Sequence, residues 1–147
     1  MSEKGINRMD LKECAQFANE VHDCYLATLD GDQPRVRAMG MWYADETGFY
    51  FQSQTVKALY KQLEKNPKVE ACFFAKGRML RVSGKVKFIT DKAVRARCIV
   101  ERKNLRDMGI TDPGDPLLAV FHLYTGEAFF WTFKDSMKEA SLPRIRF

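Results

Sequence analysis

Hydrophobic and polar residues alternate along much of this chain, which predicts short strands joined by tight turns. The run from Cys24 to Leu29 is apolar and Asp30-Gly31-Asp32 is a turn signal, so a β-hairpin is expected there. Val69 to Ala75 has the β-branched and aromatic composition of a buried strand. Residues from Met79 to Thr90 alternate at period 2, which is typical of an antiparallel strand with one buried face.

Two further pairs of strands are predicted on either side of this region. Arg35 to Tyr43 is expected to pass through a polar turn into an aromatic strand, Phe49 to Ser53, which runs back beside it. Leu117 to Tyr124 and Glu127 to Phe133 are predicted as two strands joined at Thr125-Gly126 by a two-residue hairpin connection.

Helical spacing of apolar residues replaces this alternation in three segments. The first lies within residues 1–23, starts near a capping box at Asp10 and ends before His22. The second starts at Thr55 and has apolar residues at i, i+3, i+4 and i+7. The third runs from Lys92 to about Asp107, with Asp91 as its N-cap and with Arg95, Arg102 and Lys103 on its outer face.

Together these elements predict a mainly β protein with inserted helices. About 6–7 strands and 3 helices are expected in a single domain, residues 1–147, with a polar surface tail at 134–147. Sequential hairpins favour an antiparallel sheet that curls into a small barrel.

Composition narrows the function classes. Hydrophobic residues make up 46% of the chain, which is enough for an ordinary core, and the net charge is +5. The basic residues are scattered, so no nucleic-acid site is expected, whereas an anionic small molecule suits the charge. The four cysteines stand far apart without metal-ligand spacing, so reduced thiols and no metal are expected. No long apolar run or leader-like segment appears, which predicts a cytoplasmic protein without a membrane span.

Candidate chemistry lies between Pro34 and Lys57. Arg35 and Arg37 share one strand face, and Ser53 or Thr55 can cap the helix that follows. Lys57 lies in the first helical turn, where a cation opposes the helix dipole, and an anion bound at this helix N-terminus would explain it. The alternative is that the arginines are solvated and Lys57 is merely tolerated.

Four segments in order, YLATLDGDQPRVRAMGM, FYFQSQTVKALYKQLEKNPKVEACFF, RMLRVSGKV and GEAFFWTF, resemble the pyridoxamine 5'-phosphate oxidase-like, FMN-binding split-barrel family. The similarity is greatest to its small members related to nitroimidazole resistance or general stress. The resemblance implies an antiparallel split β-barrel and a homodimer with FMN at the subunit interface.

The resemblance also implies a set of FMN contacts. Arg37 would meet the phosphate, with Arg35 as a weaker candidate, and Thr55 and Lys57 would complete the phosphate site. Met79 stands where the oxidases carry a glutamine from the other subunit, and Trp131 matches a tryptophan that reaches the flavin from the partner chain. The implied cofactor-binding residues are Arg35, Arg37, Ala38, Met39, Gly40, Gln52, Ser53, Thr55, Lys57, Met79 and Trp131.

The resemblance implies an FMN-dependent oxidoreductase acting on a small-molecule substrate, with NADH or NADPH as a candidate electron donor. Pyridoxamine phosphate oxidation is not expected, because the chain ends SLPRIRF without the oxidases' C-terminal histidine and Trp42 replaces a lysine. A flavin face lined by Trp42 and Trp131 would suit a flat or apolar substrate. No catalytic acid or base is evident.

Two other functions stay open on the sequence. One is a non-catalytic sensor or storage protein that binds flavin or haem, for which His22 and His122 are the imidazoles available as axial ligands. The other is a dimeric structural module that has lost its cofactor. Each histidine is interpreted as structural.

Overall fold

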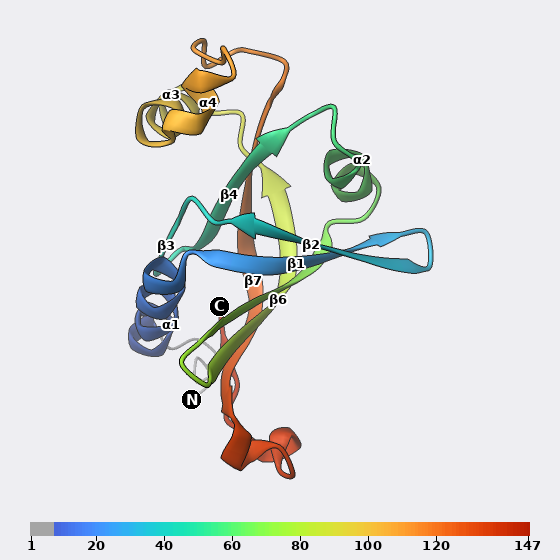
Figure 1. The fold of residues 1–147 in the computed structure, drawn as a ribbon, viewed down its shortest axis with the longest axis vertical. Coiled ribbons are helices and arrows are strands. Elements are labelled where there is room, and N and C mark those ends of the chain that lie inside the picture. Colours follow the sequence, from blue (N-terminus) through green and yellow to red (C-terminus); the bar gives the residue numbers. More distant parts are fainter. Residues whose placement is uncertain (1–7) are drawn as a thin grey trace.

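The computed structural model describes residues 8–147, with side chains from residue 11 onward. The described part is mainly β, as predicted (Figure 1). Its helices are α1 (Arg8–Val21), α2 (Ala58–Lys65), α3 (Lys92–Glu101) and α4 (Lys103–Asp107). Its strands are β1 (Asp23–Asp30), β2 (Gln33–Gly40), β3 (Tyr43–Asp45), β4 (Gly48–Gln54), β5 (Lys68–Ala75), β6 (Arg78–Phe88), β7 (Leu118–Thr132) and β8 (Ile145–Arg146). Short 3₁₀ turns, Phe133–Asp135 and Glu139–Ser141, precede β8.

All strands belong to one antiparallel sheet. Their order is β2-β1-β5-β6-β7-β4-β3, and β8 pairs with β7. The end strands β2 and β3 do not pair with each other among the described residues, so the curled sheet stays open, which agrees with the predicted split barrel. The predicted capping box at Asp10, and residues 1–7 of the expected N-terminal helix, concern side chains and residues outside the described part.

The sheet encloses the main hydrophobic core. Phe49, Phe51, Phe73 and Phe121 are fully buried inside it, and the rings of Phe51 and Phe121 stack at 5.2 Å. A second cluster lies at the other end, where α3 and α4 cover β7 and Trp42. Burial of this aromatic surface, at roughly 25 cal/mol per Å², is the main force that holds the curled sheet together.

The position of β4 in the sheet differs from the prediction. This strand does not run back beside β2, because it pairs with β3 and β7. The Met41 amide still bonds the carbonyl of His22, which directly precedes β1, and the Trp42 amide then bonds the Tyr50 carbonyl of β4, so the chain passes from β1 to β4 at this point. Among the described strands β2 pairs with β1 alone, and its other edge is open.

The predicted hairpin at Thr125-Gly126 is wrong. β7 is one continuous strand of 15 residues, and β6 pairs with it on both sides of Gly126. Gly126 stands directly opposite Gly84, and a Cβ at either position would collide with the backbone of the other strand. Gly126, which together with Gly84 allows close approach of the two strands, was thus mistaken for a turn residue.

The predicted third helix is two helices that meet at Arg102. Asp91 caps α3 as expected, because its carboxylate accepts the amides of Ala93 and Val94. The backbone of Arg102 is not helical, with φ −114° and ψ 88°. Arg95, expected on the outer face, instead donates to the carbonyls of Pro113, Asp115 and Leu118 and so holds the loop before β7.

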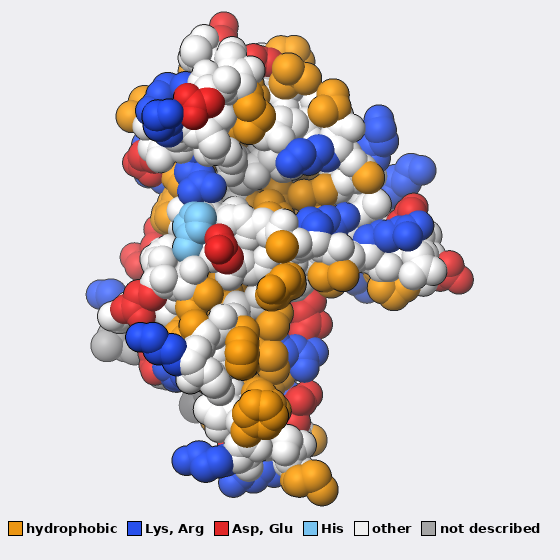
Figure 2. All heavy atoms as spheres, in the orientation of Figure 1, with side chains coloured by type: hydrophobic (Ala, Val, Ile, Leu, Met, Phe, Trp, Pro, Cys, Tyr) orange, Lys and Arg blue, Asp and Glu red, His pale blue; other side chains and the backbone are white. Residues whose placement is uncertain are grey.

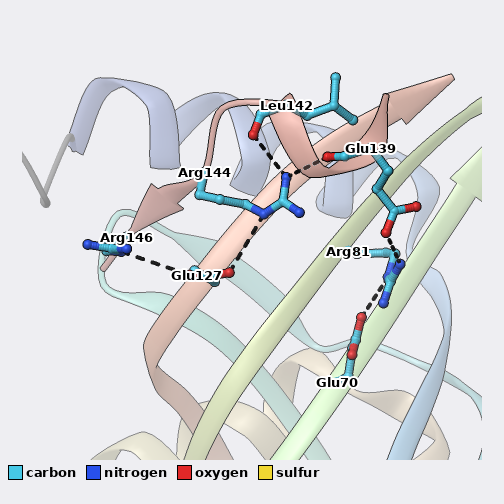
Figure 3. Close-up of polar contacts among 7 residues, drawn as sticks. All are labelled: Glu70, Arg81, Glu127, Glu139, Leu142, Arg144 and Arg146. Carbon is cyan, nitrogen blue, oxygen red and sulfur yellow. Dashed lines mark hydrogen bonds and ion pairs between the residues drawn. The ribbon is translucent and has the colours of Figure 1, made fainter. Parts of the chain in front are cut away.

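The C-terminal segment, predicted as a polar surface tail, has no buried residue from 134 to 147 and is paired with the sheet. β8 pairs with β7, and Phe147 packs against the core and exchanges backbone hydrogen bonds with Gly126. Figure 3 shows Arg144 donating to the carbonyls of Glu139 and Leu142 while it faces Glu127. Its guanidinium also lies 3.9 Å from the centre of the Phe129 ring, so one side chain fastens the segment to the sheet.

Replacing Arg144 with alanine should lower the free energy of unfolding by about 1–2 kcal/mol, because two hydrogen bonds and a cation–π contact are lost together. Urea denaturation measures the change. Arg146→Ala is the control: this arginine is exposed and has one 3.8 Å contact with Glu127, so its loss should cost within about 0.5 kcal/mol. Equal midpoints for the two variants would contradict the fastening role of Arg144.

Candidate functional site

A groove of about 470 Å³ lies where the end of β2 faces the start of α2 and the α3–α4 junction. Basic side chains gather on this face of the molecule (Figure 2). Among the described residues, the lining contains three cations, Arg37, Lys57 and Arg102, and no aspartate or glutamate. The other lining residues are Ala38, Met39, Gly40, Gln52, Ser53, Gln54, Ala58, Leu59, Asn104 and Met108. An uncompensated positive field in a recess attracts an anionic ligand.

Arg37 is held rigidly in this groove. Its guanidinium donates to the Leu26 carbonyl at 3.2 Å, to Thr28 Oγ1 at 2.7 Å and to Gln62 Oε1 at 2.8 Å. All three acceptors are neutral, and partial burial lowers the pKa of Arg37 from its ordinary value. β1, β2 and α2 thus position a cation that has no carboxylate partner among the described residues.

Lys57 lies at the N-terminus of α2, but the helix begins later than predicted. α2 starts at Ala58, and Lys57 itself is the N-cap, with no side-chain cap bond. Neither Ser53 nor Thr55 caps the helix. Thr55 Oγ1 donates instead to the Pro116 carbonyl at 2.8 Å, which ties the start of α2 to the loop before β7. The amides of Lys57 and Tyr60 donate to the carbonyls of Gln54 and Lys57, which leaves the amides of Ala58 and Leu59 to bind an anion.

Two enclosed polar atoms on the groove lining have no hydrogen-bond partner among the described residues. They are Oε1 of Gln52, a residue only 6% exposed, and Nε of Arg102. Leaving a buried donor or acceptor unsatisfied costs about 1–3 kcal/mol, so such atoms in a groove point to a ligand. The lining fits a polar, anionic ligand better than an apolar one.

Four of the sequence-predicted site residues do not lie on this groove. Arg35 forms an exposed ion pair with Asp30, and Thr55 bonds the loop as described. Met79 and Trp131 are directly opposite each other on β6 and β7. The seven residues that do line the groove are Arg37, Ala38, Met39, Gly40, Gln52, Ser53 and Lys57.

The sequence did not predict that α4 and its junction with α3 form one side of the groove. Arg102, Asn104 and Met108 line the groove, although the helical spacing placed Arg102 on an outer face. The break between α3 and α4 turns this residue inward, and no local sequence signal marks that break.

Trp42 does not line an open face, which corrects the sequence interpretation. It is only 7% exposed, it donates from Nε1 to Glu101 Oε1 at 2.9 Å, and it packs in the cluster under α3 and α4. His122 already has contacts within the protein. Its Nε2 lies 2.7 Å from the Thr47 carbonyl oxygen, and its ring stacks on that of Tyr50 with 4.0 Å between the ring centres. Burial lowers the pKa of His122.

Three of the four cysteines lie in the protein interior. Cys14, Cys24 and Cys98 are buried, and burial raises the pKa of Cys24 and of Cys98 to about 12. Over residues 8–147, no three His, Cys, Asp or Glu side chains cluster as metal ligands would. None of the helices in that range is long and apolar enough to cross a membrane.

Comparison with known proteins identifies the family and the fold. The family model described as pyridoxamine 5'-phosphate oxidase matches residues 11–132. None of the curated proteins compared with the chain matches it. Among solved structures, a NimC/NimA family protein from Clostridium acetobutylicum is 28% identical, with 97% of this chain and 96% of that one covered and a TM-score of 0.79.

Two more distant structures share the fold. A pyridoxamine 5'-phosphate oxidase-related, FMN-binding protein from Nostoc punctiforme is 13% identical, with coverage of 94% and 95% and a TM-score of 0.69. HutZ, the haem storage protein from Vibrio cholerae, is 18% identical, with coverage of 82% and 92% and a TM-score of 0.62. The match over residues 11–132 and the open antiparallel sheet together show that this chain belongs to the pyridoxamine 5'-phosphate oxidase-like family.

Proposed function

We propose that the groove binds FMN and that the protein is an FMN-dependent oxidoreductase. The observation that carries the proposal is that Arg37 of β2 and Lys57 at the N-terminus of α2 line the same groove, on which the described residues include no acid. A phosphate monoester carries about −1.5 to −2 charges at neutral pH, which these two cations balance. Membership of a family with an FMN-binding relative supports the same cofactor.

The residues fit the rest of the cofactor as well. Gln52 Oε1 lacks a partner and can accept a hydrogen bond from a flavin N–H group, while Ala38, Met39 and Gly40 offer a strand edge that no other strand covers. Bound FMN supplies hydride or electron transfer, and a nicotinamide cofactor is the proposed donor. The chain's own part is to hold the phosphate, to orient the ring along β2 and to limit water around it.

A homodimer is part of this proposal. Tyr25, Val36 and Phe74 are exposed apolar residues of β1, β2 and β5 on the outer side of the sheet. Phe74 pairs with Met79, which pairs with Trp131, so the apolar surface continues across β6 to β7. An exposed face of this kind is typical of a protein interface. On a second copy, Met79 and Trp131 would then be the residues that approach the flavin, as the family resemblance implies.

Pyridoxamine phosphate oxidation is not proposed. Of the basic residues in SLPRIRF, Arg144 is engaged with carbonyls and Glu127, and Arg146 faces Glu127 as well (Figure 3). The C-terminus therefore holds the fold rather than presenting cations to the groove. Haem binding is the alternative function, and it would use a histidine as axial ligand. Both ring nitrogens of His22 already have partners, Asp23 and Arg102, which does not favour this residue as that ligand.

The experiment is to purify the protein, add FMN, remove unbound cofactor and record the visible spectrum. A flavin spectrum is expected, and its intensity at limiting FMN should fall at least tenfold in Lys57→Ala because one charged phosphate contact is lost. Lys61→Ala, which removes a charge one turn later on α2, is the matched control and should bind as the wild type does.

Other outcomes identify the alternatives. A Soret band in the purified protein would identify haem, and not FMN, as the bound cofactor. A colourless protein that also does not bind added FMN would refute the cofactor proposal. If flavin binds, NADH or NADPH oxidation with added acceptors tests the reductase, and no turnover with either donor would leave a flavin binder. Light scattering tests the dimer, which a monomeric mass would contradict.

A further inference from the structure

Arg102 is the third cation on the groove lining. In the proposed function Arg37 and Lys57 balance the phosphate of FMN, and the described residues of the lining include no acid for Arg102 to neutralise. The acids near it are engaged elsewhere. Asp23 contacts His22, and Glu101 accepts the Trp42 indole and faces Arg97 at 3.6 Å.

His22 holds Arg102 in a defined orientation. Arg102 Nη1 lies 3.0 Å from His22 Nε2, and His22 Nδ1 lies 3.2 Å from Asp23 Oδ1. Because arginine can only donate, Nε2 accepts and the ring proton lies on Nδ1, where it faces the carboxylate. His22 has a positive φ of 68°, which directs the chain from α1 into β1 at this point.

Gly40 makes this arrangement possible. A Cβ at Gly40 would lie 2.6 Å from His22 Cε1, so only glycine lets the imidazole rest against the end of β2. The contact also places Arg102 at the Gly40 end of the groove. Arg37 is three residues earlier on the strand, where it bonds α2 through Gln62. Three strand residues span roughly 10 Å, so the backbone of Arg37 and the Gly40 position that His22 contacts lie that far apart along β2.

The free edge of Arg102 suits a carboxylate. With Nη1 bonded to His22, Nε and Nη2 have no hydrogen-bond partner among the described residues, and Nε is enclosed. These two nitrogens form the side of a guanidinium that binds a carboxylate with two parallel hydrogen bonds. Because Nε is enclosed, a carboxylate that bonds both nitrogens needs the lining around Nε to shift. Arg37 and Arg102 are thus two cations on the groove lining that have no carboxylate partner among the described residues.

We propose that Arg102 is a specificity-determining residue that binds the carboxylate of a small, flat substrate at the Gly40 end of the groove, and that His22 is its positioning residue. The inference rests on the proposed function in assigning the Arg37 end to the FMN phosphate. It replaces the apolar substrate expected from Trp42 with an anionic one.

The test compares benzoate with benzamide, which have nearly the same shape and differ in charge. Binding is followed by the change in the visible spectrum of the FMN-loaded protein, and by calorimetry in the protein without FMN. Wild type should prefer benzoate at least tenfold, and Arg102→Gln should reduce the preference below twofold. Lys103→Gln removes an exposed neighbouring charge and should leave the preference intact.

Further variants separate positioning from folding. His22→Asn tolerates the positive φ but removes the contact with Arg102, so it should give an intermediate preference with the same FMN affinity. Arg102→Lys keeps the charge and loses the two-pronged geometry, and it should also be intermediate. Circular dichroism confirms that each variant is folded.

Three results would overturn the inference: no benzoate binding by wild type at millimolar concentration, an unchanged preference in Arg102→Gln, or a loss of FMN affinity in that variant as large as in Arg37→Gln. The last would make Arg102 a cofactor ligand. If FMN does not bind at all, the proposed function fails, while an Arg102-dependent benzoate preference measured by calorimetry would still establish the carboxylate site.

Discussion

Replacing Arg37 with glutamine is expected to weaken FMN binding by roughly 30- to 150-fold, which corresponds to about 2–3 kcal/mol for a charged phosphate contact. Arg37 is fixed by Leu26, Thr28 and Gln62, so the cation is already in place before the ligand arrives. Little side-chain freedom is lost on binding, and most of the interaction contributes to affinity. Titration of the protein with FMN, followed by quenching of flavin fluorescence, gives the dissociation constant.

Arg35→Gln is the matched control for this prediction. Arg35 lies two residues earlier on the same strand and carries the same charge, but it faces the exposed Asp30 rather than the groove. Its loss should change FMN affinity less than threefold. An equal effect at Arg35 and Arg37 would mean that the general positive field, and not the built contact, holds the phosphate.

Arg37→Gln also removes hydrogen bonds inside the protein, so stability is measured in parallel. Thr28 Oγ1 and Gln62 Oε1 remain bonded to each other at 2.6 Å, which limits the loss to about 1–2 kcal/mol. If urea denaturation shows that the free energy of unfolding falls by no more than this amount, and the circular dichroism spectrum is unchanged, the affinity change is assigned to the lost contact between Arg37 and the phosphate. Global unfolding of the variant would instead give Arg37 a structural role.

Gly84→Ala should lower the free energy of unfolding by about 3 kcal/mol or more, a large part of the 5–15 kcal/mol typical of a domain. The new Cβ would collide with the Thr125 carbonyl oxygen and lie 2.9 Å from the Gly126 Cα. Neither neighbour is a flexible side chain, so β6 and β7 must separate at the centre of the sheet. Urea denaturation of the two proteins measures the difference.

Gly114→Ala provides the control for the general effect of adding a methyl group. Its nearest neighbour would be the Asp112 Oδ1 atom at 3.4 Å, so its unfolding free energy should stay within about 0.5 kcal/mol of wild type. Similar midpoints for Gly84→Ala and Gly114→Ala would contradict the close approach of the strands. They would then favour a hairpin turn at Thr125-Gly126 in place of one continuous β7.

The strands that the sequence predicted best are those with a local signal. β1, β5 and β6 each begin within one residue of the predicted start, because alternating burial and flanking turn residues lie within the same few positions. The errors occur where one signal has two structural causes. Glycine at position 126 permits a turn and equally permits two strands to approach, and only the pairing with Gly84 decides between them.

The residues of the candidate site also differ in whether a local sequence signal predicts them. Arg37 and Lys57 could be predicted because a strand face and a helix start are local patterns, and both residues lie on the groove. Arg102 could not, because it follows Arg37 by 65 positions and its direction depends on a break between two helices. The burial of Trp42 depends likewise on α3 and α4, which cover it from more than 50 residues away.

The sequence by itself determined the mainly β, antiparallel character of this protein and the presence of cations near the start of α2. Both follow from side-chain periodicity and helix-end chemistry, which depend on residues a few positions apart. The tertiary structure alone decided that β7 is continuous, that Trp42 is buried and that Arg102 completes the groove. Those outcomes arise from contacts between distant segments, whose free energies appear only once the sheet has brought them together.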